Sequence, residues 1–285
     1  KINQNWEGNY LDEKKVVLIT GASSGFGKKA ALKFLKQGCI VYAAARRTSE
    51  MQDIKLKGGH ILFLDVTDEN QVKLAVRKLI SHEGKIDILV NNAGFGGFAV
   101  FEGVSDEKAR AQFDVNVFGA AAVMREVLPY MRKRRAGIII NMSSVAGRMS
   151  VPFGSWYSAS KHALEALSDS VRMEVKPFNI KVYTIEPGMM ATGFFDVAKR
   201  EMEESKIPQD YTTSFESFTK RMTFYYKLAP SPRCTVNKIA QCARGITKAA
   251  RHPVGIDSKM GVATASMLSD RLNDFLYMKL FGVKY

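Results

Sequence analysis

Two side chains that lie four residues apart could carry out acid–base chemistry. Tyr157 and Lys161 begin and end the sequence YSASK, and in a helix this spacing places both on one face. A phenol has a pKa near ~10 and is a poor base at neutral pH. A neighbouring ammonium group favours the phenolate and lowers that pKa, so the pair could act as a general acid and base. Taken alone, the pattern also fits an ordinary amphipathic helix with a surface lysine, so its context must decide.

A glycine-rich turn near the start of the chain has the features of a phosphate-binding site. Residues 15–20 (KVVLIT) form a short β-rich apolar run, and residues 28–37 follow a helical pattern that Gly38 closes. Between them, with spacing GxxxGxG, the first glycine permits a tight turn and the second lets the backbone approach a pyrophosphate. The third allows the helix to pack closely on the strand. The turn predicts cofactor binding by Gly21, Ser23, Ser24, Gly25, Phe26 and Gly27.

The end of the second expected strand, residues 39–45, indicates the type of dinucleotide. A carboxylate at this place accepts the ribose 2′-hydroxyl of NAD and repels a 2′-phosphate. This chain has Arg46 and Arg47 instead, and guanidinium groups suit a phosphate. We therefore expect NADP(H) in preference to NAD(H), although two solvent-exposed arginines would give the same sequence.

The remaining expected strands also end in residues that could face a ligand. Strands are expected at 61–64, 86–90, 137–142 and 180–185, and helices at 68–83, at 105–128 with an interruption near Asn116, and around Tyr157. This alternation predicts a single-domain α/β protein of the Rossmann type, with a doubly wound parallel sheet and helices on both faces. Ligands bind beyond the carboxyl ends of such strands. The residues expected there are Asp65, Val66, Asn92, Ala93, Gly94, Ser144, Pro187 and Gly188.

Together, these motifs resemble those of the classical short-chain dehydrogenase/reductase family. The matching segments are TGASSGFG at 20–27, NNAG at 91–94, Asn116, INMSS at 140–144, YSASK at 157–161 and PG at 187–188. They follow the family's order and cover residues 14–195. Many NADP-preferring members carry a basic residue inside the glycine turn, where this chain has Ser24, and Arg47 could substitute for it.

The resemblance implies a catalytic set of Asn116, Ser144, Tyr157 and Lys161. Tyr157 would exchange a proton with the substrate oxygen, to which Ser144 would also hydrogen-bond. Lys161 would lower the pKa of Tyr157 and bind the nicotinamide ribose, while Asn116 would hold a water in a relay to Lys161. Thr192 would contact the nicotinamide carboxamide.

The expected domain, residues 1–285, divides into three parts. Residues 14–188 would form the cofactor-binding and catalytic core, residues 189–235 a helical substrate lid, and residues 236–285 a C-terminal extension. The lid is rich in Met and aromatic residues, which suits a bulky apolar substrate but fits ordinary helix packing equally well. Residues 252–285 resemble the ends of the hydroxysteroid and retinol dehydrogenase branch. Their amphipathic last segment could cap the active site, pack on a partner subunit or lie on a membrane.

The composition excludes several other classes of protein. Lys and Arg number 42 against 28 Asp and Glu, but they are scattered, so we expect no nucleic acid partner. Weak contact with an anionic membrane surface is left open. The three cysteines lack metal-ligand spacing, so no metal site is expected, and their small odd number suits a reducing compartment. With no signal-peptide pattern or apolar span, we expect a cytoplasmic protein. A homo-oligomer, dimer or tetramer, is implied by the resemblance only.

We therefore expect an NADP(H)-dependent oxidoreductase that interconverts a ketone or aldehyde and an alcohol on a lipophilic substrate such as a steroid, a retinoid or a long-chain ketone. One alternative is the same reaction on acyl-chain ketones, such as an acyl dihydroxyacetone phosphate or a 3-oxoacyl thioester. A basic surface would help to bind such a substrate where it is anionic. Another alternative is a non-catalytic NADP-binding regulator. The intact set of Asn116, Ser144, Tyr157 and Lys161 argues against it.

Overall fold

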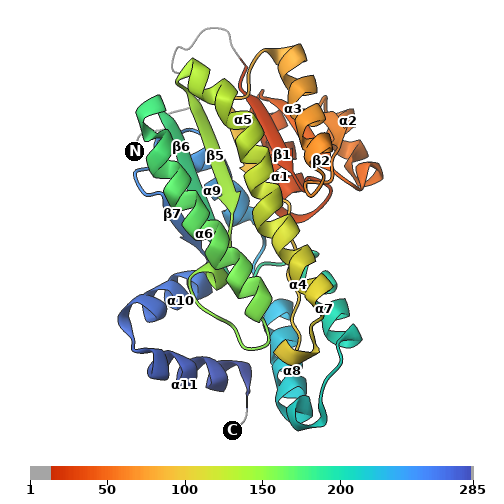
Figure 1. Ribbon diagram of the computed structural model, residues 1–285, viewed down its shortest axis with the longest axis vertical. Coiled ribbons are helices and arrows are strands. Elements are labelled where there is room, and N and C mark those ends of the chain that lie inside the picture. The colour runs from red at the N-terminus through yellow and green to blue at the C-terminus, as the bar shows by residue number, and fades with distance from the viewer. Residues whose placement is uncertain (1–13, 284–285) are drawn as a thin grey trace.

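Within residues 14–283, which the computed structural model describes, seven parallel strands form one sheet at the centre of the protein (Figure 1). The strands are β1 (Val16–Thr20), β2 (Ile40–Ala45), β3 (His60–Phe63), β4 (Ile88–Asn91), β5 (Gly137–Met142), β6 (Ile180–Pro187) and β7 (Arg251–Val254). Their order is β3-β2-β1-β4-β5-β6-β7, and every neighbouring pair is parallel. The order reverses at β1, between β2 and β4, and doubly wound sheets bind ligands beyond the strand ends at such a reversal.

Helices cover both faces of this sheet, as the sequence predicts. They are α1 (Gly25–Lys36), α2 (Gln52–Leu56), α3 (Glu69–Glu83), α4 (Asp106–Phe113), α5 (Ala120–Arg134), α6 (Ser155–Val175), α7 (Phe194–Glu204), α8 (Thr212–Lys227), α9 (Arg233–Cys242), α10 (Ile256–Met267) and α11 (Asp270–Phe281). Phe34 of α1 and Ile239 of α9 belong to the buried cluster on one face. Leu79 of α3 and Val127 of α5 belong to the cluster on the other face. The doubly wound arrangement is thereby confirmed.

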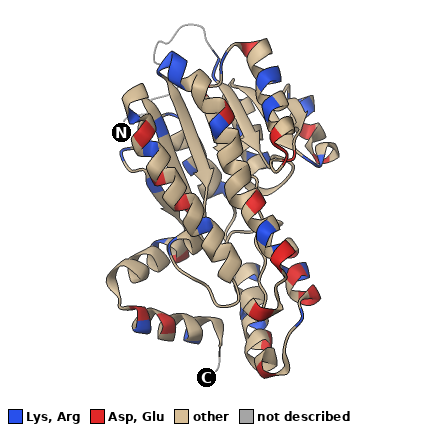
Figure 2. Cartoon of the chain, viewed as in Figure 1, with Lys and Arg blue, Asp and Glu red and all other residues tan. Residues whose placement is uncertain are grey.

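The strands form where the sequence is continuously apolar. All five residues of β1 are buried, as expected for a parallel strand covered on both faces. The first five strands contain no Asp, Glu, Lys or Arg, and such residues lie mostly on the surrounding helices and loops (Figure 2). Local signals set the helix ends. The Asp68 carboxylate accepts hydrogen bonds from the first turn of α3, and Gly84 ends this helix with a φ of +67°.

The expected helical stretch at 105–128 contains an interruption at the expected place. The chain forms α4, then the π-helical segment Asp114–Gly119, and then α5, which continues to Arg134. A π-helical turn inserts one extra residue and re-aims the side chains around it. Gly119 permits close packing here, because a Cβ at this position would lie 2.7 Å from Cγ2 of Val66.

Two features of the C-terminal third differ from the expectation. Strand β7 was not predicted, because its sequence RHPV lacks the apolar run that marks the other strands. It pairs with β6, and its Pro253 is tolerated because this is the last strand of the described sheet. The sequence of residues 235–248 also predicts one helix, and the structure has α9 there, which ends earlier, at Cys242, before a turn at Gly245 with a φ of +68°.

The expected lid, residues 189–235, contains α7 and α8. Both lie below the carboxyl end of the sheet, and α11 packs against α8 (Figure 1). An apolar cluster separate from the two sheet clusters joins these helices to the core. Its buried members are Phe98, Val100, Ala146, Met149, Tyr157, Phe195, Ala198, Met202, Phe215, Phe218, Met222 and Phe281. Among residues 14–283, no helix is both long enough and apolar enough to cross a membrane.

A buried amide ladder between β4, β5 and α6 gives a first testable prediction. Asn141 accepts a hydrogen bond from Asn91 at 3.0 Å and donates one to Ser168 at 2.8 Å. Asn141→Ala leaves the buried side chains of Asn91 and Ser168 without these hydrogen bonds. We therefore expect it to lower the free energy of unfolding by about 2–3 kcal/mol. Urea denaturation measures this loss. Asn70→Ala, at an exposed site on α3, is the control and should change stability by less than about 0.5 kcal/mol. An equally small loss for Asn141→Ala would contradict the ladder's role.

Candidate active site

Helix α6 presents Tyr157 and Lys161 on one buried face, as their spacing predicts. Tyr157 is 7% exposed and Lys161 is 5% exposed. The Lys161 Nζ atom lies 6.0 Å from the centroid of the Tyr157 ring and donates a hydrogen bond to the carbonyl oxygen of Met142 at 2.9 Å. Met142 is the last residue of β5, so the sheet fixes the position of the ammonium group.

Burial affects the protonation of both groups. It raises the pKa of Tyr157 to about 12, against the opposite effect of a hydrogen bond with Ser144. It lowers the pKa of Lys161 to about 8, although the Glu165 carboxylate raises it. The sequence predicted a lowered phenol pKa, and the structure corrects this: both groups are buried, and loss of water disfavours the charged form of each. The pair is a neutral phenol beside an ammonium group that titrates near pH 8.

Ser144 follows the end of β5 and lies beside Tyr157. Its Oγ atom accepts a hydrogen bond from the N–H of Ala146 at 3.1 Å and so begins the short helical turn Val145–Gly147. The same side chain makes the hydrogen bond that affects the Tyr157 pKa. The spacing of 13 residues between the two therefore brings them together in space.

Asn116 lies in the π-helical turn and is 1% exposed. Its carboxamide accepts a hydrogen bond from the N–H of Phe95 at 3.0 Å and donates to the carbonyl of Phe95 at 2.9 Å and to Ser160 at 3.0 Å. Gly94 brings this amide near Lys161, because a Cβ at Gly94 would lie 2.9 Å from Asn116 Oδ1 and 3.4 Å from Lys161 Nζ. The side chain thus fixes the strand-end loop, and its predicted relay to Lys161 stays a prediction.

The glycine turn is locked to the end of β4 by Asn92. The Asn92 side chain donates to the carbonyls of Thr20 and Gly21 at 3.1 and 3.0 Å, and the Thr20 hydroxyl accepts the N–H groups of Asn92 and Ala93. Gly21 has a φ of +64°, and a Cβ there would lie 2.7 Å from Cα of Ala93. A Cβ at Gly27 would lie 2.5 Å from the Asn92 amide nitrogen. Both positions therefore require glycine, because the turn lies so close to Asn92 and Ala93. Thr20, which was not predicted as a site residue, also holds the turn to the end of β4.

The two arginines after β2 have different partners. Arg47 Nη2 lies 3.4 Å from the hydroxyl oxygens of both Ser23 and Ser24 in the glycine turn. Arg46 is mostly exposed, and its Nη1 atom lies 3.5 Å from Asp65. Burial raises the pKa of Asp65, but two hydrogen bonds from Thr67, one from its N–H and one from its hydroxyl, and the charge of Arg46 hold it below its usual value. Arg47 is thus the arginine that faces the turn. Phe26, predicted with the turn, packs its side chain against the core beneath α1.

The segment after β6 closes over this turn. The N–H of Gly188 donates to the carbonyl of Val254 on β7, and the N–H of Met189 donates to the carboxylate of Asp257 at 2.6 Å. Pro187 ends β6 beside this anchor. Thr192 lies over the glycine turn, where a Cβ at Gly25 would be 3.9 Å from Cβ of Thr192. Asp257 was missed because only the fold places it near β6.

Two aromatic side chains lie close to the ring of Tyr157. Phe194, from α7, and Phe98, from the loop after β4, lie with ring centroids 5.5 and 6.1 Å from that of Tyr157. Phe98 in turn contacts Phe218 of α8, at 5.7 Å. The sequence left open whether the aromatic residues of the lid bind a substrate or pack between helices, and Phe98 lies outside that lid. Tyr157 is therefore bordered by aromatic rings, whereas Lys161 is bonded to the carbonyl group at the end of β5.

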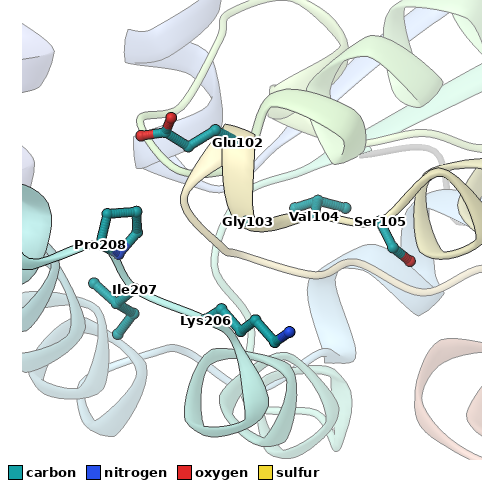
Figure 3. A pocket seen from close by; sticks show the side chains of 7 residues that line it. All are labelled: Glu102, Gly103, Val104, Ser105, Lys206, Ile207 and Pro208. Atoms are coloured by element: carbon teal, nitrogen blue, oxygen red, sulfur yellow. The ribbon is translucent and has the colours of Figure 1, made fainter.

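A surface cavity of about 490 Å³ lies where the lid meets the core (Figure 3). Its lining residues are Glu102, Gly103, Val104, Ser105, Lys206, Ile207 and Pro208. None of the predicted catalytic residues belongs to it, so we assign it to the junction between the segment that precedes α4 and the segment that follows α7.

Comparison with known proteins shows the family to which the chain belongs. Residues 15–203 match the family model described as short chain dehydrogenase. A 3-ketodihydrosphingosine reductase of Bacteroides thetaiotaomicron is 43% identical over 204 residues, or 71% of this chain and 74% of that protein. A short-chain dehydrogenase from Streptomyces avermitilis has a similar structure, with a TM-score of 0.80 and 29% identity over 94% of this chain and 96% of that one. The closed form of serine dehydrogenase complexed with NADP+ gives a TM-score of 0.63 and 34% identity over 65% of this chain and 77% of that one. The chain belongs to the short-chain dehydrogenase family of oxidoreductases.

Proposed function

We propose that the protein interconverts a ketone or aldehyde and an alcohol on a lipophilic substrate with a long apolar chain, using NADP(H). The observation that carries this proposal is the position of Tyr157, on a buried helix face that it shares with Lys161 and within the aromatic cluster that joins the lid to the core. A polar acid–base group with one apolar side suits a substrate that presents a single oxygen on a hydrophobic body.

The residues of the glycine turn and of the neighbouring strand ends fit a dinucleotide that carries a 2′-phosphate. Gly21 and Gly27 let the glycine turn pack closely against the end of β4, and the side chain of Ser24 does not cap the first turn of α1, so the N–H groups of that turn suit phosphates. Arg47, directed at Ser23 and Ser24, would bind the 2′-phosphate, with Arg46 close by. The related structure complexed with NADP+ supports this assignment. The other proposed contacts are Asp65 and Val66 with the adenine, and Asn92, Ala93, Gly94, Pro187, Gly188 and Thr192 along the strand ends.

The proposed catalytic roles follow from the protein's own groups. Tyr157, a neutral phenol, donates its proton to the carbonyl oxygen during reduction and accepts it back during oxidation. Ser144 donates a hydrogen bond to the same oxygen. The Lys161 ammonium stabilises the phenolate that remains, because an opposite charge favours the ionised form. Hydride transfer is the chemistry that the nicotinamide supplies when bound.

The aromatic lining and one relative support a long-chain substrate. The lining joins α7, α8 and α11 to the core through large apolar side chains. The relative named 3-ketodihydrosphingosine reductase carries a long-chain ketone in its name. The same relative favours the second candidate, a reductase of acyl-chain ketones with a charged head group. The hydroxysteroid or retinol branch, the cytoplasmic location, the homo-oligomer and the membrane contact stay predictions.

Replacing Arg47 tests the choice of cofactor. Because Arg47→Ala removes a charged donor from the proposed 2′-phosphate site, we expect NADPH to bind about tenfold more weakly and NADH to bind unchanged. Quenching of Trp156 fluorescence during titration measures both dissociation constants. Arg77→Ala, at an exposed site on α3, is the control and should alter neither. Tighter binding of NADH than NADPH by the wild type would refute the NADP assignment.

Tyr157→Phe tests the acid–base role. It keeps the ring packing against Phe98 and Phe194 and removes only the hydroxyl, so we expect kcat to fall by about 10²–10⁴-fold while the NADPH dissociation constant changes little. A carbonyl panel followed by NADPH absorbance measures the rate. A wild-type activity that survives this change would rule out Tyr157 as the acid, and a wild type that binds NADPH but turns over no carbonyl would favour the regulator.

A series of methyl ketones of increasing chain length tests the substrate class. Each methylene buried against the aromatic lining should raise kcat/KM about fourfold over the first several carbons, since burial of a CH₂ group contributes about 0.8 kcal/mol. Phe215→Ala, within the lining, should flatten this dependence. If only ketones with a phosphate or thioester head group react, regardless of chain length, the acyl-ketone candidate replaces the neutral lipophilic one.

A further inference from the structure

The catalytic face of α6 continues beyond the acid–base pair. Tyr157, Lys161, Glu165 and Asp169 follow one another at intervals of four residues and form one stripe along the helix. Glu165 is 3% exposed, which is rare for a carboxylate. Burial disfavours an ionised carboxylate unless other groups stabilise it, so the partners of Glu165 decide its charge.

Two strands supply these partners. On β6, the Thr184 hydroxyl donates to Oε2 of Glu165 at 3.2 Å, and on β7, Nε of Arg251 lies 3.4 Å from the same oxygen. Arg251 also pairs with Asp169, one turn further along α6. One guanidinium group is therefore shared by two carboxylates of the catalytic helix, and it joins β7 to that helix.

The Glu165 carboxylate, one helical turn from Lys161, favours the charged form of the lysine. Burial lowers the pKa of Lys161 to about 8, and Glu165 is the group that opposes this shift. Gly147 allows α6 to approach the turn after β5 at this level, because a Cβ there would lie 3.0 Å from the Lys161 carbonyl oxygen and 3.1 Å from Cγ of Glu165. Without the carboxylate, Lys161 would lose its proton at a still lower pH.

Other charged groups face the same region. Glu186 on β6 is 0% exposed, and Nη1 of Arg148 lies 3.6 Å from its Oε1 atom. Burial and then the charge of Glu165 raise the pKa of Glu186 to about 7. Burial also raises the pKa of Glu165, while hydrogen bonds and the charge of Arg251 lower it. The effect of burial is the larger one, so the pKa of Glu165 lies above its usual value, and Arg251 and Arg148 are the cations that oppose this rise.

We propose that Glu165 and Arg251 are positioning residues for the reaction: Glu165 keeps the Lys161 ammonium charged beside Tyr157, and Arg251 holds Glu165 in place. The proposal rests on the proposed roles of Tyr157 and Lys161. Neither Glu165 nor Arg251 touches the reacting atoms, and both act through Lys161.

Glu165→Gln tests the proposal, because it keeps the side-chain size and an acceptor for Thr184 but removes the charge. The titration of Lys161 is followed in protein labelled with ¹⁵N-lysine, without cofactor, through the Hε–Nζ correlation that disappears in Lys161→Arg. We expect the midpoint to move to lower pH. The alkaline limb of kcat/KM should move with it, so that activity falls about tenfold at pH 8.5 and stays within about twofold at pH 6.

Two matched variants separate this role from a purely structural one. Asp169→Asn breaks the other half of the Arg251 bridge but leaves the charge of Glu165 in place. Glu165→Asp shortens the side chain but keeps its charge. Both should retain the wild-type Lys161 midpoint and alkaline limb, whatever their melting temperatures. A purely structural bridge would lower the melting temperature in Glu165→Gln and Asp169→Asn alike and would move neither midpoint.

The Lys161 midpoint decides the inference even if the proposed function fails. A wild type without carbonyl activity would remove the function, and the titration would still show whether Glu165 sets the Lys161 charge. An unchanged midpoint in Glu165→Gln would overturn the inference even in an active enzyme. If Glu165→Gln does not fold, the double variant Glu165→Gln/Arg251→Gln removes the charged pair together and is measured in the same way.

Discussion

The burial of the Lys161 ammonium group is the constraint on which the catalytic end of the sheet depends. An ammonium group removed from water loses a solvation energy that one contact rarely replaces. Here the Met142 carbonyl accepts one hydrogen bond, and the Glu165 carboxylate follows one helical turn later. Met142 ends β5, and Thr184 holds Glu165 from β6. The position of the charge therefore depends on the register of the strands as much as on α6 itself.

The two sides of the catalytic pair are built from different interactions. On the cofactor side, the amides of Asn92 and Asn116 bind the backbone of glycine-rich loops in fixed directions. On the lid side, α7 and α8 meet the core mainly through aromatic rings such as Phe194 and Phe218. Directional hydrogen bonds suit a ligand of constant shape, whereas apolar contacts tolerate variation. This difference supports the proposal that the site binds one cofactor and recognises its substrate mainly through a hydrophobic body.

Much of this arrangement could be predicted because each motif is local. A continuous apolar run, a glycine turn and an i, i+4 pair each reveal their structure within a few residues, which is why the first six strands were found. Strand β7 could not be predicted, since its RHPV sequence is stabilised by pairing with β6 and by Arg251 binding a distant helix. The raised pKa of Tyr157 could not be predicted either, because it results from burial of the phenol. That burial depends on how the lid packs and not on the nearby lysine.

The bridge from Arg251 to α6 also sets an order of events during synthesis. Arg251 and Asp169 lie 82 residues apart, so the catalytic helix leaves the ribosome long before its guanidinium partner. Until β7 is made, β6 has an open edge, and the carboxylates of Glu165 and Asp169 lack their shared cation. Open strand edges invite pairing with other chains. Until β7 emerges, α6 therefore lacks its ion pairs with Arg251, and the edge of β6 must be protected from pairing with other chains.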